Sequence, residues 1–343
     1  TLALIDADGT IAPTEGECTE GMGLSYKGIW GYAPLLVTLA NTGEVLSAAN
    51  RPGNAPSHLG AAWFLDQAID RVLAGGFERA RLRGDTDFSL TTNFDRWNAE
   101  GVEFVFGTDA IKTLVSRAED LPETAWKRLQ RRKKRTRRTS PRERPANVKQ
   151  QIVEEKEYKN FHLEEEHLAE FSYRPGACAR PYRMIALRKT IRVTKGQLHL
   201  MDETRYFFYV TNVPRSRLSA RQVVFEANDR CHQENLIEQM KNGVHAMRMP
   251  SNGLASNWAW MLIGTLAWNI KQWMGVCLAK RMRREGEELG RMEFRRFLRS
   301  IVQLPCQLVH TARRTVLRIL VYSPWAKVLL DGTAHFRTQR RLA

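Results

Sequence analysis

The sequence lacks any apolar run long enough to cross a lipid bilayer. Its most apolar stretch, Trp258–Trp268, is followed at once by Asn269, Lys271 and Gln272, whereas a membrane-spanning helix needs about 20 consecutive apolar residues. The stretch therefore predicts a buried helix, and no membrane partner is expected. The tryptophans of this region are expected to be core residues and not stacking platforms for nucleic-acid bases: Trp258, Trp260, Trp268 and Trp273.

An initiator methionine and a secretory signal peptide are also missing. The chain opens with the strand-like run Thr1–Asp6, which carries no charged leader. We therefore expect it to be one part of a longer protein.

Cysteines are few and show no paired spacing. There are five, an odd number, and no two stand in a Cys-x-x-Cys arrangement: Cys18, Cys178, Cys231, Cys277 and Cys306. A scattered, odd set argues against a disulfide framework, and the missing close pairs argue against a zinc site. A reducing compartment, the cytoplasm, fits this usage best.

Acidic residues are too few to balance the basic ones. The chain has 53 Lys and Arg against 37 Asp and Glu, a formal net charge of +16. An excess of this size is typical of proteins that bind a polyanion, because each neutralised phosphate releases a condensed counterion. The charge predicts a nucleic-acid partner, although it does not distinguish a protein that binds DNA from one that cuts it.

The first hundred residues alternate between β-type and helical patterns. Three strands are predicted first, then a helix that Ser57 caps and Gly75-Gly76 ends, then a strand, a short helix and a last strand. These strands and the short helix are predicted at Leu2–Ile11, Gly28–Leu39, Glu44–Asn50, Arg79–Gly84, Phe94–Ala99 and Val102–Gly107. A strand meander followed by a crossover helix and further strands predicts an α/β sheet of mixed direction.

The composition changes after this region. Lys127–Arg144 holds eleven Lys and Arg and a single acidic residue, Glu143, which predicts a linker or an exposed loop. An acidic patch and two β-rich runs follow, Tyr182–Val193 and Thr204–Asn212, and the chain reads as helical from about Gln222 onward. We therefore predict three segments: residues 1–119 of a main domain, residues 120–215 as a basic linker and β-rich insertion, and residues 216–343 as the helical remainder with a basic C-terminal segment.

Two aspartates stand where predicted strands end. Asp8 is followed by Gly9, and Asp85 follows Gly84 directly. If the two strands are neighbours, both carboxylates can reach one point, and converging carboxylates suit Mg²⁺ or Mn²⁺. An Asp after a strand also commonly starts a turn, and Asp6, two residues before Asp8, would share its strand face. Both interpretations stay open at this point.

A third carboxylate, Glu234, stands in a segment with helical spacing. At about 100° per residue, Arg230, Glu234 and Lys241 fall at about 0°, 40° and 20° around a helix. They form one narrow charged stripe. Spacing alone does not separate a functional stripe from a solvated face with an ordinary Arg–Glu pair.

The order of these motifs resembles a known family. Arg230, Glu234 and Lys241 match the last three positions of Tyr-x2-Arg-x3-Glu-x6-Lys, the signature of cut-and-paste DDE transposases from bacterial insertion sequences. The Asp-Gly-Thr that begins at Asp8 resembles the first catalytic motif of that family, and Arg83–Phe88 resembles its second, Arg-x-Asp-Ser-Gly-Phe. The resemblance covers most of the chain.

The resemblance implies a ribonuclease-H-like catalytic domain that cleaves and joins DNA at insertion-sequence ends. It implies two Mg²⁺ ions, or Mn²⁺, held by Asp8, Asp85 and Glu234, with Arg230 and Lys241 on phosphates of the transposon end. Two-metal sites stabilise the attacking and leaving oxygens of an in-line displacement. The implied partners are DNA, both transposon ends and target, and a second copy of the chain in the DNA complex.

Two positions depart from the family pattern. Ala227 stands where the signature has Tyr, and Asp87 stands where the second motif usually has Gly. The first change removes a phosphate or base contact, and the second places another carboxylate beside Asp85. Two further interpretations therefore stay open: a non-catalytic, decayed DNA-binding transposase fragment, or another ribonuclease-H-like nuclease, such as a resolvase, that needs no transposon ends.

Overall fold

The computed structural model has the mixed α/β fold that the order of predicted elements indicates. It describes residues 1–16, 18–131, 148–195, 198–320, 323–326, 328 and 330. The chain forms two compact units, the first made of Thr1–Ala80 with Arg230–Ala343 and the second of Arg81–Asp229. Within the described residues, no helix has the length and apolar character needed to cross a membrane. The functional boundaries proposed after residues 119 and 215 stay a prediction.

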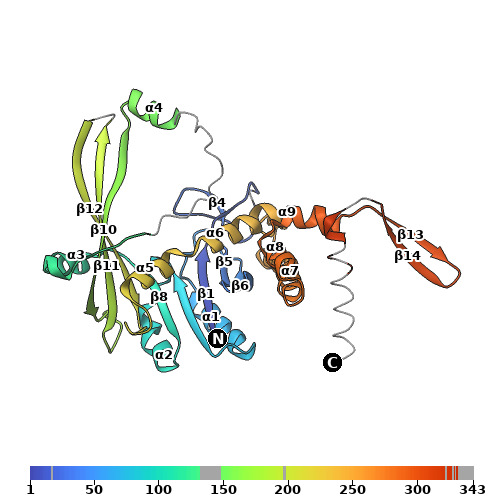
Figure 1. Cartoon of the computed structure of the whole chain (residues 1–343), viewed down its shortest axis with the longest axis horizontal. Helices are drawn as coiled ribbons and strands as arrows, with labels where there is room; N and C mark the ends of the chain where they lie inside the picture. The colour runs from blue at the N-terminus through green and yellow to red at the C-terminus, as the bar shows by residue number, and fades with distance from the viewer. Residues whose placement is uncertain are drawn as a thin grey trace. The chain divides into compact units, whose positions relative to one another are not determined.

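The first unit begins with an antiparallel sheet. β1 (Leu2–Gly9) pairs with β5 (Leu35–Leu39), which pairs with β6 (Glu44–Ala49), and α1 (Ala61–Ala74) packs on all three strands (Figure 1). The start of β7 (Arg79–Gly84) lies beside the start of β1, because the backbone N–H groups of Glu78 and Arg79 donate to the carbonyl of Thr1. A strand meander, a crossover helix and a further strand are the element order expected of a ribonuclease-H-like fold.

The second predicted strand, Gly28–Leu39, is two strands in the structure. β4 (Trp30–Tyr32) belongs to a small sheet with β2 (Ala12–Pro13) and β3 (Gly23–Leu24), and β5 starts only at Leu35. Pro34 stands between them. Proline has no N–H for a strand ladder, so the run is interrupted there.

Helix α1 starts later than predicted, and Ser57 does not cap it. Gly60 precedes the helix with φ 71°, and the loop before it is organised by the buried Arg51. The guanidinium of Arg51 donates to the carbonyls of Ser57 and Leu59, both at 2.8 Å. Burial lowers the pKa of Arg51 to about 10. The loop carbonyls are therefore satisfied by Arg51, and Gly60 makes the turn into the helix. The predicted helix end at Gly75 is confirmed.

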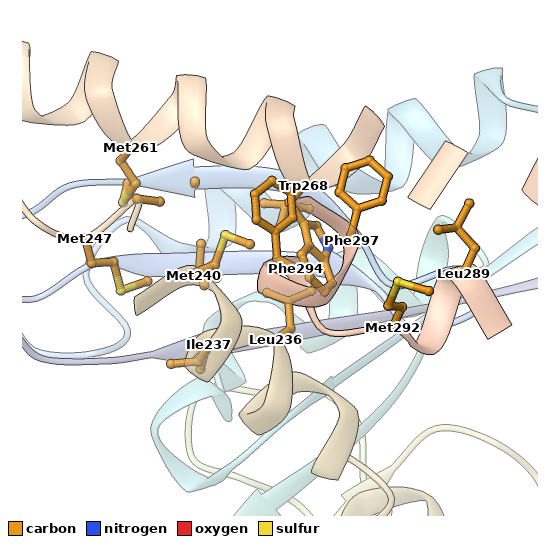
Figure 2. Close-up of a cluster of buried hydrophobic side chains, with 14 of the residues drawn as sticks. Leu236, Ile237, Met240, Met247, Met261, Trp268, Leu289, Met292, Phe294 and Phe297 are labelled. Carbon is orange, nitrogen blue, oxygen red and sulfur yellow. The ribbon is translucent and has the colours of Figure 1, made fainter. Parts of the chain in front are cut away.

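The second half of this unit is helical. After α6 (Cys231–Glu238) come a π-helical turn (Gln239–Gly243), α7 (Leu254–Ala279), α8 (Arg283–Arg291), α9 (Phe294–Phe297) and a second π-helical turn (Leu298–Val302). Figure 2 shows how Leu236 of α6 and Met240 of the π-helical turn pack with Met261 and Trp268 of α7 and with Phe294. This apolar cluster is the core between the sheet and the helices of the second half of the unit.

Helix α7 lies along the edge strand β6. The indole Nε1 of Trp258 donates to the carbonyl of Ala48, that of Trp268 donates to Gly43, and the amide of Asn269 both accepts from and donates to the backbone of Val45. An uncovered edge strand would be a site of unwanted strand pairing, so these side chains protect it. The prediction that all four tryptophans are core holds for Trp268 alone, since Trp258, Trp260 and Trp273 are 36%, 42% and 45% exposed.

The C-terminal segment is not helical throughout, which corrects the sequence-based expectation. β13 (Cys306–Thr311) and β14 (Arg314–Ile319) form an antiparallel hairpin. Their β-branched and aliphatic residues favour strands, and Pro305 stands directly before β13.

The second unit contains a parallel strand pair and a long antiparallel meander. Arg81–Gly84 of β7 pair in parallel with Glu103–Phe106 of β8 (Glu103–Thr108), and β8 pairs with β12 (Leu198–Thr211). β12, β11 (Tyr182–Lys195), β10 (Lys159–Tyr173) and β9 (Lys127–Arg128) follow in that order (Figure 1). The helices of this unit are α2 (Phe94–Ala99), α3 (Lys112–Glu119), α4 (Val148–Glu155) and α5 (Ala220–Asn228).

The two β-rich runs predicted in this unit are confirmed as β11 and β12, and the acidic patch before them supplies a third strand, β10. Its carboxylates pair across the sheet with basic residues of β11: Glu170 lies 2.7 Å from Arg183, and Glu164 lies 3.3 Å from Arg192. Opposite charges that face each other on neighbouring strands stabilise the pairing. Of the basic segment Lys127–Arg144, the first residues form β9, and residues 132–144 lie outside the described part.

Candidate active site

Asp8 lies at the end of β1 beside a basic group of the first unit. Its Oδ2 atom is 3.8 Å from Nη2 of Arg230, and the two side chains are 18% and 14% exposed. A half-buried ion pair at this distance is a genuine electrostatic contact, although it is longer than a hydrogen bond. The structure thus brings together two of the residues that the motifs single out 222 positions apart in the sequence.

Asp6, like Asp8, lies on the side of the sheet that faces α6. It is 1% exposed, stands opposite Thr38 in the β1–β5 register, and lines a cavity of about 570 Å³. His232 and Gln233 of α6 line that cavity too. Asp6 and Asp8 therefore both face the α6 side of the sheet, and the choice between them as first ligand stays open.

The helix that carries the third motif is broken, which corrects the expectation of one continuous charged stripe. α5 ends at Asn228, Arg230 has the non-helical angles φ −96° and ψ 9°, and α6 begins at Cys231. Lys241 lies in the π-helical turn that follows α6. π-helical turns occur often at functional sites. The 100° spacing therefore fails at both ends of the motif.

The carboxylate of Asp8, which contacts Arg230, also acts electrostatically on Lys241. Burial lowers the pKa of Lys241, and Lys27 lowers it further, whereas Glu238 and Asp8 act to raise it. Two basic groups are thus linked to Asp8, the Arg230 guanidinium by an ion pair and the half-buried Lys241 ammonium by its electrostatic influence. Two such groups can hold phosphate oxygens, since both donate hydrogen bonds to anions.

Glu234 is exposed on α6. The buried side of this helix carries Leu236 and Ile237, and the neighbouring Gln233 is the residue that points to the sheet, with its Nε2 atom 3.4 Å from the carbonyl of Leu36. The carboxylate of Glu234 is therefore open to a ligand from solvent.

Asp85 begins a tight turn in the second unit. Its Oδ1 atom accepts the backbone N–H of Asp87 at 3.1 Å, and the side chain is exposed. The preceding Gly84 is required by packing, because a Cβ there would lie 2.5 Å from Cβ of Phe88. The turn-starting role considered from sequence is thus confirmed, and it leaves the carboxylate at the surface, beside the exposed Asp87.

A buried ion network in the second unit was missed from sequence. Arg81 of β7 donates to Glu103 at 2.9 and 2.6 Å and to Glu226 of α5 at 2.7 and 2.5 Å. Burial alone would lower the pKa of Arg81, but Glu226 and Glu103 raise it overall. Arg83 also reaches the carbonyl of Glu226. β7, which Asp85 follows directly, is thereby connected to α5, the helix that precedes Arg230 in the chain. The sequence signal that could have revealed this network is the presence of Arg81 and Arg83 within a strand whose neighbouring residues are buried.

The three candidate metal ligands have suitable chemistry, but the structure does not show them as a ready cluster. Among the residues that it describes, no three His, Cys, Asp or Glu side chains form a group that could hold a metal ion. Carboxylate oxygens are the ligands that Mg²⁺ prefers, so the donor set of Asp8, Asp85 and Glu234 fits a hard cation. Their convergence on shared ions stays a prediction.

The fold and the order of the motifs define a class, the DDE enzymes with a mixed α/β core. Within that class, the chain belongs to the family described as transposase DDE domain group 1, whose model matches residues 2–341. The predicted family is thereby confirmed at the level of the DDE transposase domain, and an origin in a bacterial insertion sequence stays a prediction.

The solved structures that are similar to the chain include a transposase complex. It is the cryo-EM structure of the piggyBac transposase synaptic complex with hairpin DNA, with a TM-score of 0.42 and 11% sequence identity. The similarity covers 88% of this chain and 54% of that chain, so the chain spans about half the length of that transposase. No curated protein matches the chain significantly.

Proposed function

We propose that this chain is the catalytic part of a DNA transposase, which cleaves and rejoins DNA strands by metal-dependent phosphoryl transfer. The observation that carries the proposal is the ion pair between Asp8 and Arg230 in a chain of the DDE transposase domain family. Arg230 contacts Asp8, and Asp8 acts on Lys241. A carboxylate at a strand end, with one cation in contact and a second under its electrostatic influence, is suited to a phosphate that arrives with its metal.

The residues have separate roles in this proposal. Asp8, Asp85 and Glu234 hold Mg²⁺ or Mn²⁺, with Asp6 as the alternative to Asp8. When bound, the ions supply an activated oxygen nucleophile and neutralise the charge on the leaving oxygen. Arg230 and Lys241 bind the oxygens of the phosphate at the transposon end and hold it in position for displacement.

The proposal also covers the DNA substrates, a second copy of the chain and the cellular compartment. The substrates are the ends of a bacterial insertion sequence and a target duplex, a second copy of the chain takes part in the DNA complex, and the reaction takes place in the cytoplasm. The net charge of +16 supports a polyanionic substrate.

The test is cleavage of a labelled duplex that contains an insertion-sequence end, with and without Mg²⁺. Asp8→Ala, Asp85→Ala and Glu234→Ala should each lower the cleavage rate at least about a hundredfold, because each removes a metal ligand. DNA affinity should be retained. Asp87→Ala is the matched control, since Asp87 is an exposed carboxylate two positions from Asp85. A ligand variant that cuts at the wild-type rate removes that residue from the site, and Asp6→Asn then tests the alternative.

A decayed, non-catalytic transposase is the second candidate, and one observation favours it. Ala227, at the position of the signature Tyr, packs against the apolar core of the second unit. It therefore serves structure and cannot make the phosphate or base contact of a tyrosine. DNA binding without any Mg²⁺-dependent cleavage would support this candidate. Cleavage that ignores the end sequence would instead support a different ribonuclease-H-like nuclease.

A further inference from the structure

The outward face of α7 is apolar apart from the exposed Ser256 near its start. The helix contains no Asp, Glu or Arg, and its one charged residue, Lys271, is 0% exposed. Eight large apolar side chains are between 36% and 66% exposed: Trp258, Trp260, Leu262, Ile263, Leu266, Ile270, Trp273 and Val276. Because a full aromatic side chain carries about 150–250 Å², these fractions amount to on the order of 600 Å² of apolar surface, the upper end of what a monomer exposes.

That area is what one partner contributes to a stable protein–protein contact. A standard interface takes about 800 Å² from each side, somewhat more than half of it apolar. The exposed face of α7 alone therefore supplies the apolar part of such an interface.

The centre of this face has a symmetric spacing. Its residues follow one another at intervals of four, three and four positions on each side of Leu266: Ala255, Ala259, Leu262, Leu266, Ile270, Trp273 and Cys277. Two such helices packed antiparallel about a two-fold axis at Leu266 would place Leu262 opposite Ile270 and the small Ala259 opposite the large Trp273. Small residues opposite large ones let two helices approach closely, as in knobs-into-holes packing.

The two ends of α7 have opposite charge. At its start, the carboxylate of Glu20 accepts the backbone N–H of Leu254 at 3.0 Å, and at its end stand the exposed Lys280 and Arg281. An antiparallel partner brings the acidic start of one helix to the basic end of the other. The helix dipoles are then also opposed, which is favourable.

From this self-complementary pattern we propose that α7 is the contact between two copies of this chain, packed antiparallel about a two-fold axis at Leu266. Each copy contributes the same patch, as a closed dimer requires. The contact forms without DNA and goes beyond the phosphoryl transfer proposed above. Its test contains no nucleic acid, so its failure would leave that proposal untouched.

Sedimentation of the whole chain in the absence of DNA measures the dimer directly. Trp273→Glu and Ala259→Glu should each weaken dimerisation at least about 30-fold, the loss expected for a charge buried at the centre of an interface. Trp63→Glu is the matched control, because Trp63 is 60% exposed on α1 and lies off this face. Circular dichroism confirms that each variant is folded. A wild-type chain that stays monomeric at roughly 50 µM, far above the dissociation constant of a typical stable dimer, overturns the proposal.

A disulfide tests the register. Ala255 and Cys277 are 22 residues apart on one helix, about 33 Å at 1.5 Å per residue, so a bond between them can form only between two copies. Ala255→Cys should give a covalent dimer on oxidation, and adding Cys277→Ser should abolish it. Leu266→Cys with Cys277→Ser should cross-link to itself at the axis. A dimer that persists without these cross-links would lie on another surface, such as the β13–β14 hairpin, and the proposal would be wrong.

Discussion

The lysine inside α7 should make the stability of the protein rise with pH, and Lys271→Met should remove that rise. Lys271 is 0% exposed, its Nζ donates to the carbonyl of Gly290 at 2.9 Å, and it lies 4.4 Å from the centre of the Trp268 ring. Burial lowers the pKa of Lys271 from 10.5 to about 8. The folded chain therefore binds this proton less tightly than the unfolded chain.

The direction of the effect follows from proton linkage. Below about pH 8 the ammonium is charged in both states, and its burial penalty is fully present; the penalty fades as the pH rises toward the unfolded value of 10.5. At 1.36 kcal/mol per pKa unit the full penalty is about 3 kcal/mol, of which about 2 kcal/mol should be recovered between about pH 7 and pH 9.5.

Urea unfolding at a series of pH values, followed by tryptophan fluorescence at one protein concentration, measures this change. Methionine keeps the length of the side chain but leaves the carbonyl of Gly290 without its donor, which costs about 1–3 kcal/mol. The net effect at pH 7 is therefore small, and the pH dependence is the decisive readout. Lys280→Met, at the exposed end of the same helix, is the control. Equal pH dependence in the wild type and Lys271→Met would refute the assigned pKa shift.

Three further outcomes follow from the site and its surroundings. Arg230→Ala and Lys241→Ala should slow strand cleavage at least about tenfold and weaken DNA binding far less, because the proposed function places both on the phosphate beside Asp8. Single-turnover rates and binding titrations with the same duplex compare the two effects. Effects of equal size would assign these residues to general binding of the DNA backbone. Gly84→Ala should destabilise the protein by about 1–3 kcal/mol, because the added Cβ would lie 2.5 Å from Phe88. Gly176→Ala is the control, since a Cβ there would meet nothing within 4 Å. Unchanged urea unfolding of Gly84→Ala would show that the backbone before Asp85 can shift to accommodate the methyl group. Neutralising four basic residues of Lys127–Arg144 should reduce the slope of log K for DNA binding against log salt concentration. The reduction should be about 0.9 for each DNA phosphate that the variant no longer neutralises, and it should be equal on random and end-containing DNA. Parallel lines for the variant and the wild type would show that the segment is a tether that does not contact DNA.

The local structure could be predicted wherever the signal is local. β7 and α2 have their predicted bounds, and β8 differs from its prediction by one residue at each end. Gly75 and Gly76 mark the end of the preceding helix, and apolar runs bounded by polar turns define the strands. The predicted helix starts and ends were wrong where a residue distant in the sequence determines the local structure. The loop before α1 is held by Arg51, and the helix break at Arg230 coincides with the contact between Arg230 and Asp8.

The sequence alone indicated the family and the kind of partner. Net charge indicated a polyanion, and three motifs in the order of a DDE transposase indicated the family that the chain belongs to. These signals are properties of residue types and their order along the chain, so they need no coordinates. The roles of Asp85 and Glu234 as metal ligands remain predictions from the same source.

Only the tertiary structure decided which groups meet. Arg81 contacts Glu226, 145 positions away, and Asp8 contacts Arg230; no spacing in the sequence encodes either pair. The same holds for α7. A helix that is apolar all round has no preferred buried side in its sequence, and here packing against β6, α8 and the π-helical turn Gln239–Gly243 selects that side. The opposite face, centred on Leu266, is left exposed among the residues that the structure describes.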